Sequence, residues 1–260
     1  MRIMTWNVNS VRLRLAGLAR LTEEAAPDVV CLQEIKADAD KFPFDAIREL
    51  GYEHIEIEGI PGYHGVATLS RTPIGRLQGR DWCGKKDGRY VGVELGDGLQ
   101  VHNFYVPAGG DEPDPDVNDK FRHKLDFLEE MRAWGRDLSE RDAVLVGDLN
   151  VAPLPTDVWS HKQLLKIVSH TPVETDALDA VAQDGGWTDL VRRTTPPEEK
   201  LFSWWSYRSR DWTKNDRGRR LDHIWGQGAA ADRFRHAAVL KEARGWEKPS
   251  DHVPIIADFD

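Results

Sequence analysis

Acids, amides and an imidazole stand at the ends of short apolar runs, where a folded chain could bring them together. The segments are "TWN" at 5–7, "LQE" at 32–34, "GDLN" at 147–150, "RLD" at 220–222 and "SDH" at 250–252. Carboxylate and amide oxygens are ligands that Mg²⁺ prefers, and a bound metal with a nearby acid or base can hydrolyse phosphodiesters. The residue types therefore indicate metal-assisted phosphate chemistry.

Each side chain suits a separate task in that chemistry. Glu34 and Asp251, with the amide of Asn7, form a hard oxygen set suited to Mg²⁺. Few cysteines and scattered histidines make a zinc site a poor alternative. Asp148 and Asn150 could hold and deprotonate a water molecule, which would then attack phosphorus.

Asp222 and His252 complete the set, because a carboxylate can orient an imidazole and favour its charged form beside a phosphate. A structural alternative stays open, since Asp and Asn often cap strands or form turns and each residue taken alone fits that role. Five such segments in one chain favour a cluster, because ligands of α/β folds bind beyond the ends of strands.

The segments that must position these groups alternate between strand and helix patterns. Apolar runs predict strands at 2–7, 28–34, 52–58, 65–70, 90–95, 99–106, 142–150, 219–225, 233–240 and 253–259. Helices are predicted at 10–26, with Ser10 as N-cap, at 43–51 and at 118–138, and long surface loops at 107–115 and 153–172. Side chains two apart in a strand share a face, so we expect Val30, Leu32 and Glu34 to point the same way.

The bulk composition excludes a uniformly basic nucleic-acid coat. The net charge is −9, and phosphate binding depends on Lys and Arg, so any DNA site must be local. Cys31 and Cys83 lack the spacing of a metal knuckle or a redox pair, which fits a reducing cytoplasm. Neither a signal-peptide core nor the roughly twenty apolar residues that cross a bilayer occur, so no membrane association is expected.

Eight motifs in order resemble the exonuclease III family of apurinic/apyrimidinic (AP) endonucleases, within the wider endonuclease/exonuclease/phosphatase superfamily. They run nearly end to end and are "TWNVNSVR", "PDVVCLQEIK", "GYHGVATLS", "NFYVP", "GDLNVAP", "FSWWSYRS", "RGRRLDHI" and "KPSDHVP". The resemblance implies an α/β fold over a single domain, 1–260. That fold is a four-layered α/β sandwich, with two mixed β-sheets packed face to face and flanked by helices.

The resemblance also implies which residues form the site. Mg²⁺, with Mn²⁺ able to substitute, would be bound by the principal ligand Glu34, with Asn7 and Asp251 beside it. The catalytic residues would be Tyr105 at the phosphate, Asp148 as base, Asn150 as its partner, and Asp222 behind the phosphate-binding His252.

Members of this family cut the DNA backbone on the 5′ side of an abasic sugar, and many also act as 3′–5′ exonucleases or trim 3′ ends. We therefore expect a monomeric cytoplasmic enzyme acting on double-stranded DNA with abasic sites or damaged 3′ ends. One alternative is a phosphatase or phosphodiesterase of the same fold that acts on inositol phosphates or lipids. Another is a non-catalytic DNA-binding relative, which the full catalytic set disfavours.

The segment 192–220 favours DNA as the substrate. It holds nine basic residues, including Arg210, against four acids, with aromatic residues between them. A solvated loop over a tryptophan core is the alternative. The resemblance implies DNA-binding roles for Trp204 and Leu221 as walls of the abasic-sugar pocket, for Arg208 inside the duplex, and for Lys36, Tyr63 and Arg89 at the DNA backbone.

Three features depart from the family pattern. Arg219 stands where relatives can carry an apolar or aromatic pocket residue, and the loop 109–119 holds five acids that should repel phosphate. The connector at 160–174 also differs from its usual form. These departures leave open the affinity for abasic sites and its balance with exonuclease activity.

Overall fold

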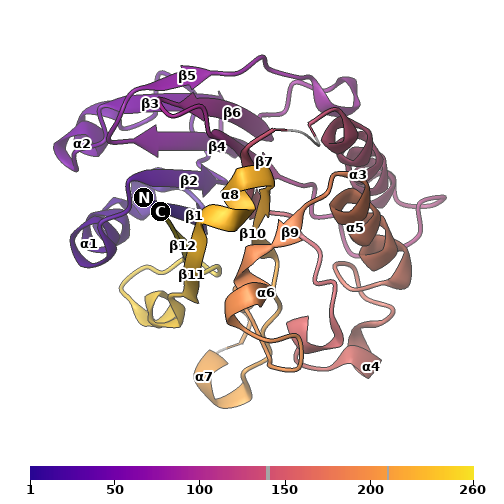
Figure 1. The fold of residues 1–260 in the computed structure, drawn as a ribbon. Helices are drawn as coiled ribbons and strands as arrows, with labels where there is room; N and C mark the ends of the chain where they lie inside the picture. The colour runs from indigo at the N-terminus through magenta and orange to yellow at the C-terminus, as the bar shows by residue number, and fades with distance from the viewer. Residues whose placement is uncertain (139–140, 210) are drawn as a thin grey trace.

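The computed structural model describes residues 1–138, 141–209 and 211–260, and within these ranges the strands form two six-stranded sheets (Figure 1). The first sheet has the order β11-β12-β1-β2-β4-β3 and the second β5-β6-β7-β8-β10-β9. The strands are β1 (Arg2–Asn7), β2 (Val29–Gln33), β3 (His54–Ile60), β4 (Tyr63–Ser70), β5 (Ile74–Arg76), β6 (Tyr90–Leu95), β7 (Gln100–Tyr105), β8 (Ala143–Asp148), β9 (Thr188–Asp189), β10 (Asp222–Gln227), β11 (Phe234–Val239) and β12 (Ile255–Phe259).

Both sheets are mixed. β1 runs parallel to β2 and antiparallel to β12, while β8 runs parallel to β7 and antiparallel to β10. The ten predicted strands correspond to ten of these elements, and the sequence patterns miss only the short edge strands β5 and β9 among the described residues.

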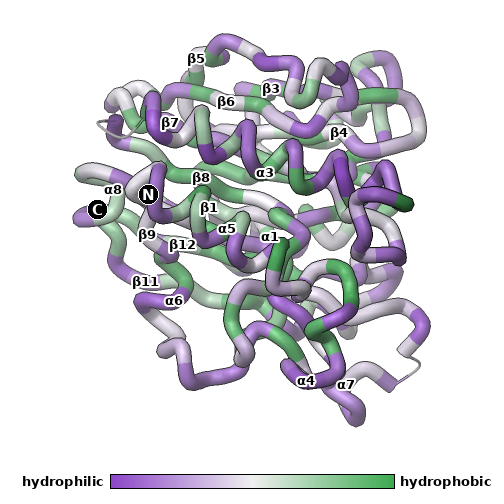
Figure 2. The backbone as a smooth tube through the Cα atoms, turned by 90° about the vertical axis from the view of Figure 1, so that its right-hand side faces the viewer, coloured by the Kyte–Doolittle hydropathy of each residue, from purple (hydrophilic) through white to green (hydrophobic). Residues whose placement is uncertain are grey.

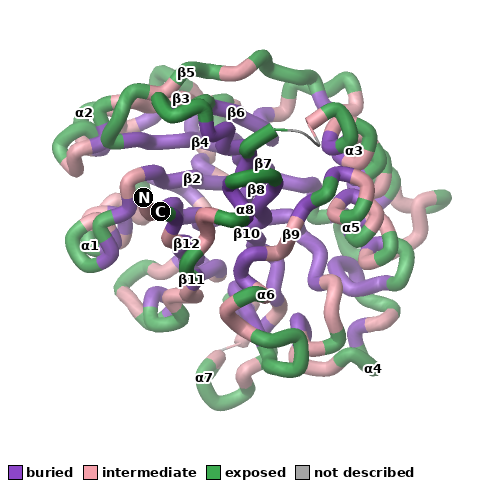
Figure 3. The backbone as a smooth tube through the Cα atoms, viewed as in Figure 1, coloured by how far each residue is buried: buried purple, intermediate pink, exposed green. Residues whose placement is uncertain are grey.

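The sheets pack face to face around an apolar layer. Inward side chains of β1, β2, β7, β8 and β10 form one buried cluster that includes Ile3, Cys31, Val101, Val146 and Ile224. Figure 3 shows the central strands buried and the outer turns of the helices exposed. The cluster explains why these strands are apolar up to their last residues.

Helices cover the outer face of each sheet. α1 (Leu15–Ala25) and α2 (Phe44–Glu49) pack Leu18 and Ile47 against the first sheet. α3 (Asp119–Asp137) and α5 (Pro172–Asp184) pack Phe127 and Leu178 against the second. Figure 2 shows apolar and polar residues alternating along α3, as expected for a helix with one buried face. The predicted four-layered α/β sandwich is confirmed.

The first helix begins later than the sequence predicts. A 3₁₀ turn (Val11–Leu13) follows Ser10, and α1 starts at Leu15. Ser10 has a φ of 88° and occupies the N-cap position of the 3₁₀ turn, but its side chain makes no capping hydrogen bond there. Its backbone N–H donates to Glu34 O at 2.7 Å, which ties the loop after β1 to the loop after β2, and the N-cap residue of α1 is Arg14.

α5 begins inside the segment predicted as a loop at 153–172 and extends beyond it. Thr171 and Glu174 form a capping box, and Pro172 occupies the first turn, which is a recognisable helix start. The remaining helices are short: α4 (His161–Leu164), α6 (Leu190–Thr194), α7 (Trp212–Asn215) and α8 (Gly228–Arg233), with 3₁₀ turns at Trp82–Gly84, Pro155–Asp157 and Lys241–Gly245. Across the described ranges, every helix is too short or too polar to cross a bilayer.

Candidate active site

Strand ends from both sheets meet at one edge of the sandwich. β1 ends there at Asn7, β7 at Tyr105 and β8 at Asp148. β10 and β12 run antiparallel to their neighbours, so their first residues lie at the same edge. In the sheet register Asp148 pairs with both Tyr105 and Asp222. The fold therefore brings polar ends together from segments far apart in sequence.

Glu34 joins this group through a turn that breaks the strand alternation. Its φ of 50° lies in the left-handed region, directly after the end of β2. Val30 and Leu32 pack outward against the helices, whereas Glu34 Oε1 accepts hydrogen bonds from Asn7 Nδ2 at 3.0 Å and Tyr105 OH at 2.9 Å. The expectation that these three residues share a face is wrong, because the strand ends before Glu34.

Asp148 is buried between an amide and an imidazole. Asn7 Nδ2 donates to Asp148 Oδ2 at 2.9 Å, and His252 Nε2 lies 3.7 Å from the same oxygen. The other ring nitrogen, His252 Nδ1, lies 2.8 Å from Asp222 Oδ2, which also accepts from Ser203 Oγ at 2.6 Å. A continuous polar row, Asn7–Asp148–His252–Asp222, thus crosses from one sheet to the other.

Burial and charge set the protonation of this row. Burial raises the pKa of Asp148 to about 7, although the charge of His252 opposes the rise. Burial lowers the pKa of His252, but the charges of Asp222 and Asp148 outweigh it and raise that pKa to about 10. At neutral pH the imidazole is therefore charged, and Asp148 titrates in the range where a general base is most effective.

Asn150 and Tyr105 complete the reacting face. Asn150, with a φ of 54°, donates its backbone N–H to Asp148 Oδ1 at 3.0 Å and its Nδ2 to Val106 O at 2.9 Å. Burial, with the charges of Glu34 and Asp148, raises the pKa of Tyr105 well above its ordinary value. The phenol consequently stays a hydrogen-bond donor.

Asp251 lies beside Glu34 through a chain of contacts. Asn9 Nδ2 donates to Asp251 Oδ1 at 3.0 Å, and Trp204 Nε1 donates to Oδ2 at 3.0 Å. Lys36 Nζ donates to Asn9 Oδ1 at 2.6 Å and lies 3.0 Å from Glu34 Oε2. The two carboxylates predicted as metal ligands therefore belong to one connected network.

This donor set fits a hard divalent cation. Glu34 and Asp251 line the same cleft. Burial raises the pKa of each, but hydrogen bonds and nearby cations outweigh that effect, so both pKa values lie below the ordinary range. Ionised carboxylates with room for water are what Mg²⁺ requires. Asn7 Nδ2 donates to Glu34, and its Oδ1 accepts from Asn9 N at 3.1 Å. The role of Asn7 as a metal ligand stays a prediction.

Asp148, Asp222 and His252 form a second group of possible metal ligands, but they already contact one another. Single ligand atoms of Asp148, Asp222 and His252 lie within 4.8 Å of one another. The short contact between His252 and Asp222 already uses one ring nitrogen, and imidazole is a weaker partner for Mg²⁺ than carboxylate. This geometry suits orientation of His252 better than binding of a hard cation.

Ser250 fixes the loop that carries Asp251 and His252. Its buried hydroxyl donates to Asn7 O at 2.7 Å and accepts from His252 N at 3.2 Å. Trp6 Nε1 donates to His252 O at 3.1 Å. Ser250 thus ties the loop to the end of β1.

A cleft of about 790 Å³ opens from the reacting face toward the segment 204–221. Trp204, Arg208 and Leu221 line it, and so does Asp111 of the acidic loop. Tyr63 lies outside the lining, 71% exposed at the start of β4. The cleft thus contains three of the predicted DNA-binding residues, and Arg210 of the same segment lies outside the described residues.

The other two predicted DNA contacts face the catalytic residues. Arg89 is 7% exposed, its Cζ lies 5.0 Å from the Tyr105 ring centroid, and its Nε lies 2.5 Å from Asp87 Oδ2. Lys36 is engaged by Glu34 and Asn9. Both residues position catalytic groups in this structure, and their contact with DNA stays a prediction.

Sequence reasoning misses a buried ion pair beneath the site. Lys124 and Glu174 are in direct contact, and both side chains are 0% exposed. Lys124 Nζ also donates to Asn150 O at 2.7 Å, while Glu174 accepts from the backbone N–H groups of Ser169 and Thr171. The "TPVE" motif could reveal Glu174 as a helix cap, but no local signal pairs it with Lys124.

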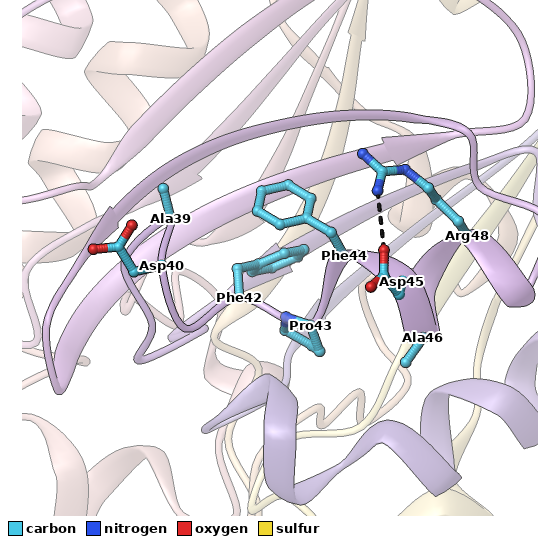
Figure 4. A pocket seen from close by; sticks show the side chains of 8 residues that line it. All are labelled: Ala39, Asp40, Phe42, Pro43, Phe44, Asp45, Ala46 and Arg48. Atoms are coloured by element: carbon cyan, nitrogen blue, oxygen red, sulfur yellow. Dashed lines mark hydrogen bonds and ion pairs between the residues drawn. The ribbon is translucent and has the colours of Figure 1, made fainter.

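A separate hollow lies over α2, away from the reacting residues. Figure 4 shows Phe42 and Phe44 beside each other, with Arg48 paired to Asp45 at 3.3 Å. Its lining comes from residues 39–48. It shares no residue with the polar row, so the candidate chemistry belongs to the first cleft.

Comparisons with known proteins agree with this geometry. The model of the endonuclease/exonuclease/phosphatase family matches residues 4–252. The chain is 30% identical to exodeoxyribonuclease III of Haemophilus influenzae, with 100% of both chains covered. It is 32% identical to the solved AP endonuclease of Archaeoglobus fulgidus, with a TM-score of 0.92 and coverage of 100% and 99%. It is 30% identical to a 3′ phosphatase, NExo, from Neisseria bound to a product DNA hairpin, with a TM-score of 0.90 and coverage of 100% and 99%.

The matched range includes every residue of the polar row and both carboxylates beside it. The relatives span the whole chain rather than one segment, and their folds superpose over its full length. The chain therefore belongs to the endonuclease/exonuclease/phosphatase family and is a phosphodiester-hydrolysing nuclease of the exonuclease III and AP endonuclease type.

Proposed function

We propose that the protein is a Mg²⁺-dependent DNA repair enzyme that hydrolyses the backbone of duplex DNA on the 5′ side of an abasic site. Trimming of damaged 3′ ends by the same site is part of the proposal. The observation that carries it is the buried row Asn7–Asp148–His252–Asp222 beside the ionised Glu34 and Asp251. All of these residues come from one chain, so a monomer would be sufficient.

Mg²⁺ bound by Glu34 and Asp251 would supply positive charge to the phosphate and to the leaving 3′ oxygen. His252, charged and steadied by Asp222, would bind a non-bridging phosphate oxygen. Tyr105 donates its single proton to Glu34 here, so it would bind the substrate phosphate by exchanging that partner once Glu34 holds the metal. The two amide protons of Asn7 go to Glu34 and Asp148, so Asn7 would orient these two carboxylates.

The proposed reaction is a direct hydrolysis. The oxygen of a water molecule forms a bond to phosphorus, and one of its protons passes to Asp148 Oδ2. The P–O3′ bond breaks in line with the attack, and the 3′ oxygen leaves and takes up a proton from solvent. The products are a 3′-hydroxyl and a 5′-phosphate on the abasic residue. No covalent intermediate with the enzyme forms.

Two relatives support the choice of substrates. The protein of Archaeoglobus fulgidus is an AP endonuclease, and that of Neisseria is a 3′ phosphatase bound to DNA. Trp204, Leu221 and Arg208 line the cleft beside the polar row, which supports binding of an extruded sugar and its DNA strand there.

The test is nicking of a labelled duplex that carries one tetrahydrofuran abasic analogue. We expect Mg²⁺-dependent cleavage that maps to the 5′ side of the analogue and leaves a 3′-hydroxyl, with no cleavage in EDTA. A matched duplex without the analogue is the control. Failure of the pure protein to nick the abasic duplex at any Mg²⁺ concentration would contradict the proposal.

A further inference from the structure

Asp111 brings a negative charge into the cleft that is proposed to bind DNA. It belongs to the acidic loop 109–119, and of the five acids in that loop only Asp111 lines the cleft. The residue is exposed, and no Lys, Arg or His of the described residues lies within 4.0 Å of its carboxylate. The part of the chain that the structure describes therefore leaves this charge without an ion-pair partner.

Hydrogen bonds on both sides of Asp111 hold its backbone at the cleft. Asn118 Nδ2 donates to Gly109 O at 2.9 Å and to Glu112 O at 2.6 Å, so one amide spans the residues around Asp111. Gly109 and Gly110 have φ angles of 91° and 74°, a conformation that glycine adopts without steric cost. The position of Asp111 is thus set by the fold of the loop.

The acidic loop starts beside the reacting face. Lys124 Nζ donates to Asn150 O at 2.7 Å and to Ala108 O at 3.4 Å, so the residue before the loop lies next to a residue of that face. Asp111 enters the cleft from this side, whereas the arginines of the cleft come from the segment 204–221. The cleft therefore carries an acid on the side of the catalytic residues and bases on the segment that faces DNA.

Internal and terminal substrates differ in the charge that follows the reacting sugar. In the proposed function the reacting phosphate lies at His252 and the abasic sugar lies against Trp204 and Leu221, which line the same cleft as Asp111. At an internal site the strand continues from that sugar through another phosphate, whereas at a 3′ end it stops with a hydroxyl. Like charges repel, so a carboxylate without a counter-charge disfavours the substrate that carries the extra phosphate.

We propose that Asp111 is a specificity-determining residue that disfavours a phosphate directly after the reacting sugar and thereby favours 3′ ends over internal abasic sites. This inference rests on the proposed function, because that function places the sugar in this cleft. The arginines of the cleft attract the phosphates of both kinds of substrate, so they raise the affinity for both. The effect of Asp111 should be fivefold or less, since exposed charge pairs are weak, at about a factor of two to five.

Three duplexes with the same scissile phosphate isolate this charge. In the first, a tetrahydrofuran abasic analogue is followed by an ordinary phosphate and further nucleotides. In the second, the strand ends at the analogue with a 3′-hydroxyl. In the third, a neutral methylphosphonate replaces the following phosphate and the strand continues. Cleavage gives kcat/KM for each duplex, and fluorescence anisotropy with the Asp148→Asn protein gives each Kd without turnover.

Asp111→Asn should raise kcat/KM and the affinity for the first duplex by about threefold and leave the second and third nearly unchanged. High salt should reduce this gain, because it screens exposed charges. Glu112→Gln is the matched control, since it removes one charge from the same loop outside the cleft lining. It should keep the ratios between the three duplexes as they are in the unmodified protein.

An equal change for all three duplexes with Asp111→Asn would overturn the inference, and so would the same change of ratio with Glu112→Gln. Failure of the proposed function is distinguishable, because it would abolish cleavage of all three duplexes by the unmodified protein. The Kd ratios of the Asp148→Asn protein, with and without Asp111→Asn, would still decide for or against the role of Asp111.

Discussion

The two sides of the cleft differ in how their charges are satisfied. On the catalytic side, Asp148 and Asp222 are buried and each has an imidazole or amide partner. On the other side, Arg208, Arg217 and Arg219 line the cleft with no carboxylate of the described residues within 4.0 Å. The first side is assembled before any substrate arrives, whereas the three arginines of the second form no ion pair with a described residue, although Asp111 lines the same cleft. Chemistry and substrate binding should therefore be separable by mutation.

The largest expected effect comes from Asp148→Asn. Loss of the base should lower the single-turnover rate on the abasic duplex on the order of a thousandfold, while the Kd for DNA changes little. The measurement is rapid-quench cleavage at saturating protein, with anisotropy for the Kd. If the rate stays within tenfold of the unmodified protein, the role assigned to Asp148 is wrong.

A slightly smaller effect is expected when the buried Lys124–Glu174 ion pair beneath the catalytic residues is broken. Lys124→Met leaves Glu174 buried without its cation, so we expect a loss of about 3–5 kcal/mol in the free energy of unfolding. Urea denaturation measures it. The control is the Lys124→Met/Glu174→Gln double variant, which should recover part of the loss. Full stability of the single variant would show that the pair does not hold the site together.

Three buried histidines differ in charge, and the difference follows from contact with a carboxylate. The ring of His252 contacts Asp222, whereas His102 and His223 form no ion pair with a described residue. Burial lowers the pKa of His102 and His223 to about 3, whereas that of His252 is raised to about 10. In the unfolded chain His102 and His223 take up protons below about pH 6.5, whereas in the folded chain they do so only near pH 3. The free energy of unfolding therefore decreases as the pH is lowered from about 6.5 to about 3. Between pH 7 and pH 5, each of the two histidines should lower it by about 2 kcal/mol.

The measurement is urea denaturation at both pH values with His102→Asn as the variant. Asn can still accept the hydrogen bond from Tyr90 OH, which lies 3.0 Å from His102 Nδ1. The fall in stability between pH 7 and pH 5 should be about 2 kcal/mol smaller in the variant. An unchanged fall would contradict the buried neutral state of His102.

The smallest effect is expected on the arginine side. Arg217→Ala removes one unpaired cation of the cleft, so the slope of log K against log salt should decrease by about 1, with a modest loss of affinity. Anisotropy between low and high salt measures the slope, and the exposed Arg12, which lies outside the cleft lining, is the matched control. Equal slopes for both variants would argue against DNA in this cleft.

Sequence patterns predict most of the architecture because the strands are apolar up to the site. Asn7, Asp148 and Asp222 follow or begin buried runs, and strand ends in one sandwich meet at one edge. The turn at Glu34 escapes the pattern, since a left-handed residue reverses the face without any glycine to mark it. A single domain over 1–260 stays a prediction.

The remainder depends on contacts between distant segments. In the sequence Lys124 resembles any lysine of an amphipathic helix. Its ion pair with Glu174 forms only because α5 packs against α3. Arg89 has the sequence character of a surface residue, yet the fold buries it against Tyr105. Such pairings have no local periodicity, so sequence reasoning cannot find them.

Hydrolysis of the abasic duplex in ¹⁸O-labelled water tests the central claim most directly. Direct attack of water on phosphorus with release of the 3′ oxygen predicts one ¹⁸O atom in the 5′-phosphate of the abasic fragment and none in the 3′-hydroxyl. Mass spectrometry of the two fragments after a single turnover locates the label. Cleavage without label in the 5′-phosphate, or with label in the 3′-hydroxyl, would contradict the proposed chemistry of the buried row.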